Sequence, residues 1–190
     1  RSPVVPPVIL SVGSLIPRKG YDVLLAALAR LTDLDWRAVI IGSPDRAPVT
    51  AAQLRDAAAT LGERVQLVGE ADGEAVLKAA QEATLFALAT RYEGYGMVFL
   101  EAMAAGLPVV ATRGGATADV IPPDAGLLAD VDDVDGVAAA IRAILTDDTL
   151  AQRLSAGAKR AGTAAQGWAD TARQVSDRLT AAREAKAAQS

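Results

Sequence analysis

The stretch Val8-Ile9-Leu10-Ser11-Val12-Gly13 decides which fold this sequence predicts. It is a run of apolar, mostly β-branched residues ended by a glycine, which is typical of a strand buried on both faces of a sheet. Residues 19–31 follow with apolar side chains three and four positions apart, the spacing of a helix that packs one face on a sheet. Strand and helix together form the first part of a strand–helix–strand unit.

The same alternation continues along most of the chain. Strands are predicted at residues 38–42, 65–69, 85–88, 108–112 and 126–128. Helices are predicted at residues 50–61 with Thr50 as N-cap, 74–82, 97–105, 134–145, 149–161 and 168–187. Strands that alternate with helices of this length form parallel βαβ units. The sequence therefore predicts one doubly wound α/β domain with a parallel sheet of about six strands.

Composition narrows the chemistry that this domain can perform. The 190 residues are 51% hydrophobic, which is enough for one well-buried domain. The net charge is -4, and the absence of a basic stripe with interleaved aromatic residues argues against nucleic-acid binding. With neither cysteine nor histidine, the chain has no thiolate metal site and lacks the commonest general base. Any chemistry of this domain must therefore use carboxylates, cationic side chains, hydroxyls and backbone dipoles.

In a doubly wound fold, ligands bind where the carboxyl ends of strands meet the starts of helices. The first such loop contains Gly13, Ser14, Arg18 and Lys19. Backbone N–H groups at a helix start favour an anion, and the two cations add positive charge. The loop fits neither standard phosphate fingerprint, so a phosphate site and a solvated turn both remain open.

A second loop opens the helix expected at residues 97–105. Its glycines permit close approach of a ligand, and the helix start offers free N–H groups. We predict that Glu101 lies on a buried helix, where an unpaired carboxylate is costly and a ribose diol supplies two donors. Glu93 precedes the helix and is placed to accept hydroxyl hydrogens from a sugar. The candidate ligand-binding residues of this loop are Glu93, Gly94, Tyr95, Gly96, Met97 and Glu101.

Each glutamate also has a purely structural interpretation. Glu101 can pair with a neighbouring cation or backbone N–H, and Glu93 can complement the helix dipole. Another loop, residues 112–117, contains Gly114-Gly115, which suggests close approach to a ligand or a facing domain, or a plain connection. The residues alone leave these alternatives open.

From about Val8 to Trp168 the chain resembles the C-terminal domain of the family-four glycosyltransferases of the GT-B fold. The strongest element is Glu93-Gly94-Tyr95-Gly96 followed by Leu100-Glu101-Ala102-Met103-Ala104-Ala105-Gly106-Leu107-Pro108. It is similar to the family's signature of two glutamates separated by seven residues. The opening with Arg18-Lys19-Gly20 also resembles the family's phosphate-binding loop.

The resemblance implies a Rossmann-like domain that is one half of a GT-B fold, and it implies site roles. Glu93 contacts the donor sugar, Glu101 the ribose and Lys19 the diphosphate, while residues 94–97 supply backbone contacts. Glu93 and Lys19 are then the catalytic candidates. Many family members carry an arginine where this chain has Ser14, and Arg18 is the candidate that compensates.

The implied function is the donor-binding half of a retaining glycosyltransferase that transfers a hexosyl group from a UDP- or GDP-sugar. The leaving diphosphate helps to take the acceptor proton, so no metal or other cofactor is expected. The alternatives are a non-catalytic nucleotide-sugar-binding module and a GT-B-fold epimerase fragment. Hydride transfer is disfavoured because the dinucleotide fingerprint is missing.

The resemblance also implies partners and boundaries. We expect residues 1–7 to be a linker from a missing N-terminal acceptor-binding domain, residues 8–165 the nucleotide-sugar-binding domain, and residues 166–190 a C-terminal helix and tail. The isolated domain is expected to be inactive. The expected location is cytoplasmic, with membrane contact only through the missing half.

Overall fold

The computed structural model describes residues 5–165, so the helix expected at residues 168–187 lies outside the described residues. The strands are β1 (Val8–Val12), β2 (Arg37–Ile41), β3 (Val65–Gly69), β4 (Leu85–Leu88), β5 (Val109–Thr112) and β6 (Gly126–Ala129). The helices are α1 (Tyr21–Ala29), α2 (Pro48–Ala59), α3 (Gly73–Glu82), α4 (Met97–Ala104), α5 (Thr117–Val120) and α6 (Val134–Thr146), followed by helical residues 148–165. Short 3-10 turns precede α1 and β3, at Pro17–Lys19 (η1) and Gly62–Arg64 (η2).

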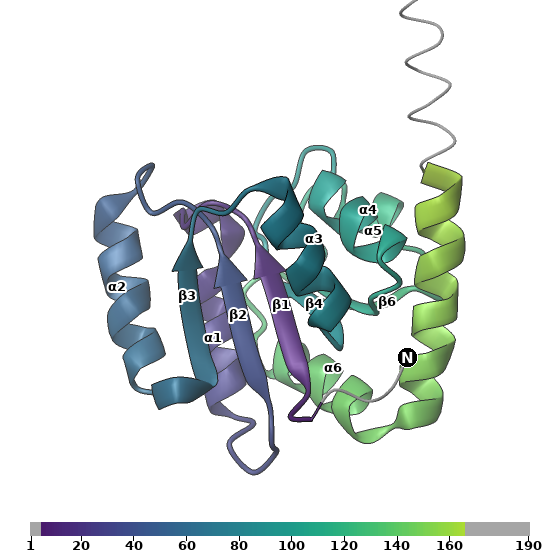
Figure 1. Ribbon diagram of the computed structural model, residues 1–190, viewed down its shortest axis with the longest axis horizontal. Helices are drawn as coiled ribbons and strands as arrows, with labels where there is room; N and C mark the ends of the chain where they lie inside the picture. The colour runs from purple at the N-terminus through teal and green to yellow at the C-terminus, as the bar shows by residue number, and fades with distance from the viewer. Residues whose placement is uncertain (1–4, 166–190) are drawn as a thin grey trace, which may run out of the picture.

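All six strands are parallel and form one sheet in the order β3-β2-β1-β4-β5-β6 (Figure 1). This confirms the predicted doubly wound sheet. The chain builds outward from β1 to β3, then crosses back to place β4 on the other side of β1. The strand order therefore reverses between β1 and β4. Ligands of such folds bind beyond the carboxyl ends of the strands at this point.

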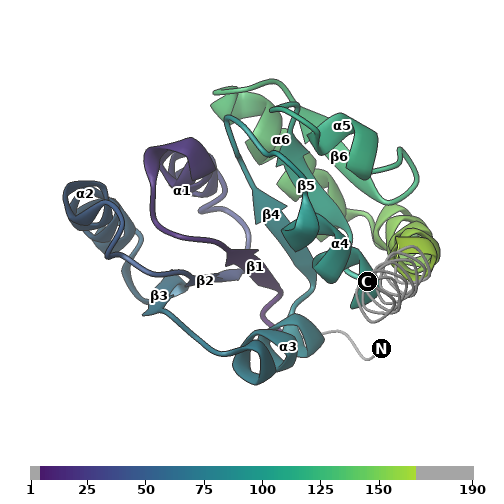
Figure 2. The same cartoon turned by 90° about the horizontal axis from the view of Figure 1, so that it is seen from above.

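Helices cover both faces of the sheet. Helices α1, α2 and α6 lie on one face and α3 and α4 on the other (Figure 2). Every residue of β4 and β5 is buried, as expected for central strands of a two-sided sheet. Phe99 of α4 packs edge-to-face on Phe86 of β4, with ring centroids 5.9 Å apart. This aromatic pair fixes α4 against the strand that precedes it.

The prediction that Thr50 caps a helix is wrong. Helix α2 begins at Pro48, and Ala47 is its N-cap. Proline suits the first turn of a helix because its fixed φ is already helical and its missing N–H has no partner there anyway. Thr50 therefore lies inside the first turn. In the region described, no helix is both long and apolar enough to cross a bilayer.

Candidate functional site

The loops that follow β1 and β4 are joined directly where the strand order reverses. The carbonyl oxygen of Arg18 accepts hydrogen bonds from the Arg91 backbone N–H (2.8 Å) and the Thr90 hydroxyl (3.1 Å). In return, the Arg18 guanidinium donates to the carbonyl of Tyr92 at 2.6 Å. The two predicted site loops are thus one connected structure, although more than 70 positions separate Arg18 from Tyr92.

Gly20 lets these loops approach so closely. Its φ is +64°, in the left-handed region, and it ends η1 and caps α1. A Cβ at this position would lie 1.8 Å from the carbonyl oxygen of Ala89, far inside van der Waals contact. Only glycine meets both requirements.

Lys19 and Glu93 meet at the centre of this structure. The Lys19 ammonium lies 2.6 Å from Oε2 of Glu93, and the two side chains are only 12% and 13% exposed. Burial by itself raises the pKa of Glu93. The Lys19 hydrogen bond, the charges of Lys19 and Arg18 and a backbone N–H of Gly96 outweigh burial, so that the pKa lies below its ordinary value. Glu93 is therefore ionised at neutral pH, and both predicted catalytic candidates lie in one place.

The loop with the glycine pair after β5 is hydrogen-bonded to the backbone of Glu93. The Glu93 N–H donates to the carbonyl of Gly114 (3.2 Å), and the Glu93 carbonyl accepts from Ala116 N–H (2.8 Å). Gly115 has φ +65°, and a Cβ there would lie 2.3 Å from the Glu93 carbonyl oxygen. Within this chain, the paired glycines permit close approach to the Glu93 loop.

Gly13 is held by the fold on both of its polar groups. Its N–H donates to the carbonyl of Ile41 (2.9 Å), and its carbonyl accepts from the Tyr21 hydroxyl (2.8 Å). Burial raises the pKa of Tyr21 well above its ordinary value, so Tyr21 stays a donor. Gly13 thus shapes the loop after β1 but has no free N–H group to donate to a ligand. Ser14 next to it is half-buried.

Residues 94–97 form the opening of α4. Gly96 has φ +70° and is the N-cap of the helix. The side chains of Tyr95 and Met97 are 84% and 57% exposed, and Tyr92 is also exposed. Free N–H groups of the first helical turn and an exposed apolar rim therefore lie together next to Glu93.

A hollow of about 540 Å³ lies beside this opening, between α3 and α4. Val12 at the end of β1 and Val98 in the first turn of α4 line it, so it adjoins both site loops. Its other lining residues are Leu10, Ala71, Gly73, Val76, Leu77, Ala80, Phe86, Glu101, Ala102, Ala104 and Ala105. Its size and mostly apolar walls suit a small organic ligand.

The prediction that Glu101 is a buried helical carboxylate is wrong. Glu101 is exposed on the wall of the hollow. The buried residues of α4 are Phe99, Ala102 and Met103, which share one face of the helix at the three- and four-residue spacing. Glu101 points away from that face. Its carboxylate is open to a ligand without the cost of an unpaired buried charge.

Arg91, for which no sequence pattern predicted a role, lies at the centre of an ion-pair network with Asp22 and Asp132. The one sequence feature that could have pointed to Arg91 is its position at the end of a strand, directly before the predicted site.

Among the described residues, no group of three or more acidic side chains is placed to hold a metal ion.

A parallel sheet in this order, with both site loops at its reversal point, defines a Rossmann-like domain. Its match to solved structures identifies it as one half of a GT-B fold. The chain belongs to the family "Glycosyl transferases group 1", whose model matches residues 1–161. This confirms the resemblance seen in the glutamate signature.

Two curated relatives show the extent of the match. The chain is 40% identical over 138 residues to the phosphatidyl-myo-inositol mannosyltransferase of Mycolicibacterium smegmatis, covering 70% of this chain and 34% of that protein. It is 36% identical over 186 residues to the D-inositol 3-phosphate glycosyltransferase of a Nocardioides species, covering 90% and 40%. The chain thus spans well under half the length of these relatives.

Solved structures also match this chain over about half of their own length. A sucrose-phosphate synthase from Thermosynechococcus elongatus matches with a TM-score of 0.78 and 31% identity, over 93% of this chain and 46% of that one. The Anabaena protein HepE in complex with UDP-glucose matches with a TM-score of 0.82 and 22% identity, over 94% and 50%. The second likeness concerns the fold alone.

Proposed function

We propose that this chain binds a nucleoside-diphosphate sugar and is the donor-binding half of a retaining hexosyltransferase that uses a UDP- or GDP-sugar. The observation that carries the proposal is the Lys19–Glu93 pair next to the hollow that Glu101 lines. Relatives named as glycosyltransferases and a structural neighbour in complex with UDP-glucose support it.

The proposed pose follows from the order of residues along the site. The nucleoside occupies the hollow between α3 and α4, with its ribose hydroxyls donating to Glu101. Because Val12 and Val98, which line the hollow, adjoin the β1 loop and the start of α4, the diphosphate then lies between that loop and that helix start. Lys19 and the N–H groups of the helix start face it there. The sugar lies beyond, next to Glu93.

The proposed role of these residues is electrostatic. When the bond to the sugar breaks, negative charge builds up on the leaving diphosphate, and a cation held nearby stabilises it. Lys19 supplies that charge, with Arg18 as a second source. The diphosphate helps to take the acceptor proton, so the scheme needs neither a histidine nor a metal of the protein's own. The acceptor-binding half and a cytoplasmic location are part of the same proposal.

Calorimetric titration of the chain with UDP, GDP and ADP tests the proposal. We expect selective binding of one nucleotide, with Lys19→Ala weakening it because a phosphate partner is lost. Glu101→Ala should weaken it by about 1–3 kcal/mol, the scale for a charged hydrogen bond. Lys78→Ala is the matched control, because Lys78 is an exposed lysine on α3 that does not line the hollow. Equal losses in all three variants, or no binding by a folded sample, would contradict the proposal.

A further inference from the structure

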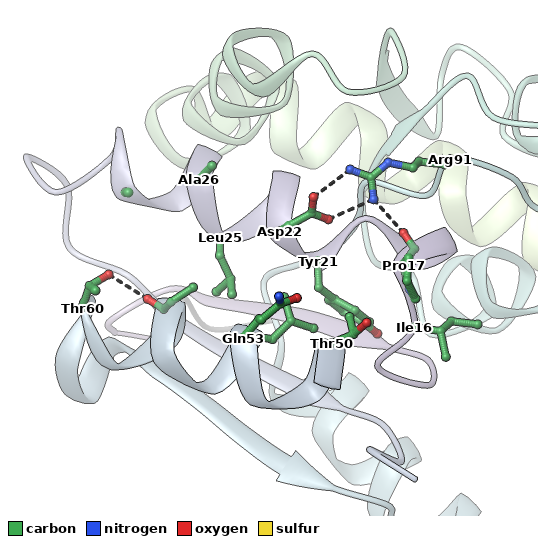
Figure 3. Close-up of a pocket in the computed structure, with 13 residues that line it drawn as sticks. Ile16, Pro17, Tyr21, Asp22, Leu25, Ala26, Thr50, Gln53, Thr60 and Arg91 are labelled. Carbon is green, nitrogen blue, oxygen red and sulfur yellow. Dashed lines mark hydrogen bonds and ion pairs between the residues drawn. The ribbon is translucent and has the colours of Figure 1, made fainter. Parts of the chain in front are cut away.

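Arg91 makes an unusually complete set of contacts at the edge of the site (Figure 3). Its guanidinium forms a two-pronged pair with Asp22, at 2.7 and 3.0 Å, and donates to the carbonyl of Pro17 at 2.6 Å. Its Nε donates to Asp132 at 2.7 Å. A planar guanidinium can bind several partners at once because its five N–H groups point in fixed directions.

These partners come from separate parts of the chain that meet at the carboxyl edge of the sheet. Pro17 begins the η1 turn between β1 and α1, and Asp22 lies in the first turn of α1. Arg91 follows β4, and Asp132 follows β6. Asp132 has φ +63°, a left-handed conformation that is uncommon for any residue but glycine. The ion pair with Arg91 joins the Asp132 side chain to the loop after β4.

Lys19 lies inside the segment that Arg91 holds. The Pro17 carbonyl is two residues before Lys19, and the Asp22 carboxylate is three residues after it. The backbone of Arg91 is itself two residues before Glu93. A single side chain thus binds the backbone before Lys19 and the Asp22 carboxylate after it, and joins both to the loop that presents Glu93.

We infer that Arg91 is a positioning residue, which sets Lys19 opposite Glu93 without touching the ligand. The inference rests on the proposed function, in which Lys19 faces the diphosphate of the donor and Glu93 lies next to its sugar. Arg91 lines a second hollow, of about 330 Å³ between α1 and α2, whose lining residues do not include Lys19 (Figure 3).

The chain offers a matched control for a purely structural ion pair. Arg142 of α6 forms the same two-pronged pair with Asp33, at 2.7 and 2.8 Å. Asp33 follows the C-terminal end of α1, whereas Asp22 lies in its first turn. Arg142 is therefore alike in chemistry but at the far end of the helix from the site.

The test compares Arg91→Met with Arg142→Met in the full 190-residue chain. NMR titration gives the pKa of the Glu93 carboxyl, and calorimetry gives the affinity for UDP and GDP. We expect Arg91→Met to raise the pKa of Glu93 toward its ordinary value. Binding should weaken about tenfold, the lower end of the loss seen when outer partners of metal ligands are removed. Arg142→Met should change neither quantity, although both variants lose an ion pair.

Asp22→Asn separates positioning from the direct effect of charge, and it serves if Arg91→Met fails to fold. By direct electrostatics, removing a negative charge lowers the pKa of a nearby carboxyl. If Arg91 and Asp22 position Lys19, the pKa of Glu93 rises instead, because Lys19 moves away. A folded Asp22→Asn variant in which this pKa falls or stays unchanged overturns the inference. If the unaltered chain binds no nucleotide, the proposed function fails, while the pKa still decides whether Arg91 positions Lys19.

Discussion

Lys19 and Glu93 show how one pair of residues can be both stable and available to a ligand. The Lys19 ammonium has three N–H donors, and its contact with Glu93 at 2.6 Å engages one of them. The remaining donors can bind a phosphate while the pair stays intact. In the proposed pose, Glu93 therefore orients the ammonium toward the diphosphate rather than competing with it. This favours a site that is largely formed before the ligand arrives.

At the same scale, Gly20 should tolerate no side chain. We expect Gly20→Ala to lower the free energy of unfolding by about 3 kcal/mol or more, because it combines left-handed strain with a clash against the Ala89 carbonyl. Urea denaturation of both proteins measures this difference.

Gly62→Ala separates the two causes. Gly62 also has a left-handed φ, +61°, but a Cβ there meets nothing within 4 Å. Backbone strain alone should therefore cost about 1–2 kcal/mol. If Gly20→Ala costs no more than Gly62→Ala, the close approach of the two loops does not have the importance that we assign to it.

At the scale of the element, helix starts differ in what fixes them. The Asp72 carboxylate accepts the Ala75 N–H at 2.8 Å and caps α3. We expect Asp72→Ala to cost about 1 kcal/mol of unfolding free energy. Thr50→Ala should change it by less than about 0.5 kcal/mol, because Thr50 is not the N-cap of α2. Thermal unfolding of the two variants checks both values, and a larger loss for Thr50 would contradict the helix start at Pro48.

The positions of the strands were predictable because each strand is a short apolar run between polar or glycine-containing loops. The predicted strand at residues 65–69 and β3 coincide, and β2 begins one residue before the predicted run. Buried parallel strands give this strong signal because both faces must be apolar. Helix α5, four residues long, gave no such signal, since a single turn has no repeating pattern.

The site was predictable to the level of its loops but not of its contacts. The glutamate signature and the cations of the first loop led to Lys19 and Glu93, which the fold brings together. The contacts of Arg91 depend on where three distant strands end in space, which no local pattern contains. The exposure of Glu101 was inferred wrongly because its neighbours in sequence are apolar, although they occupy another face of the helix.

At the scale of the whole molecule, stability should fall in acid. Four carboxyl groups have pKa values below their ordinary values: Asp22, Asp33, Glu93 and Asp124. Hydrogen bonds within ion pairs lower the pKa values of the three aspartates. For Glu93, burial raises the pKa, but the contacts with Lys19 and Arg18 outweigh it. The unfolded chain therefore binds protons more readily than the folded one. The stabilisation is complete above the ordinary carboxyl pKa of about 4 and is lost as the pH falls below it.

Urea titrations at a series of pH values measure this loss, and Glu93→Gln is the informative variant. Glutamine does not titrate. The free energy of unfolding of the Glu93→Gln variant should therefore fall less steeply between about pH 5 and pH 3 than that of the unaltered chain. Equal slopes for the two proteins would show that the pairing of Glu93 contributes nothing to the acid response.

The reversal between β1 and β4 divides the sheet into two halves, each continuous in sequence. Strands β1 to β3 end at residue 69 and β4 to β6 begin at residue 85, and the ladder between the halves pairs only Ile9 with Leu85 and Leu10 with Phe86. A backbone break in residues 70–72 would leave two fragments with Lys19 on one and Glu93 on the other. Neither fragment would hold a complete site. Nucleotide binding by a mixture of the two would then be a direct signal that they had reassembled, which makes this domain a natural candidate for a split-protein reporter.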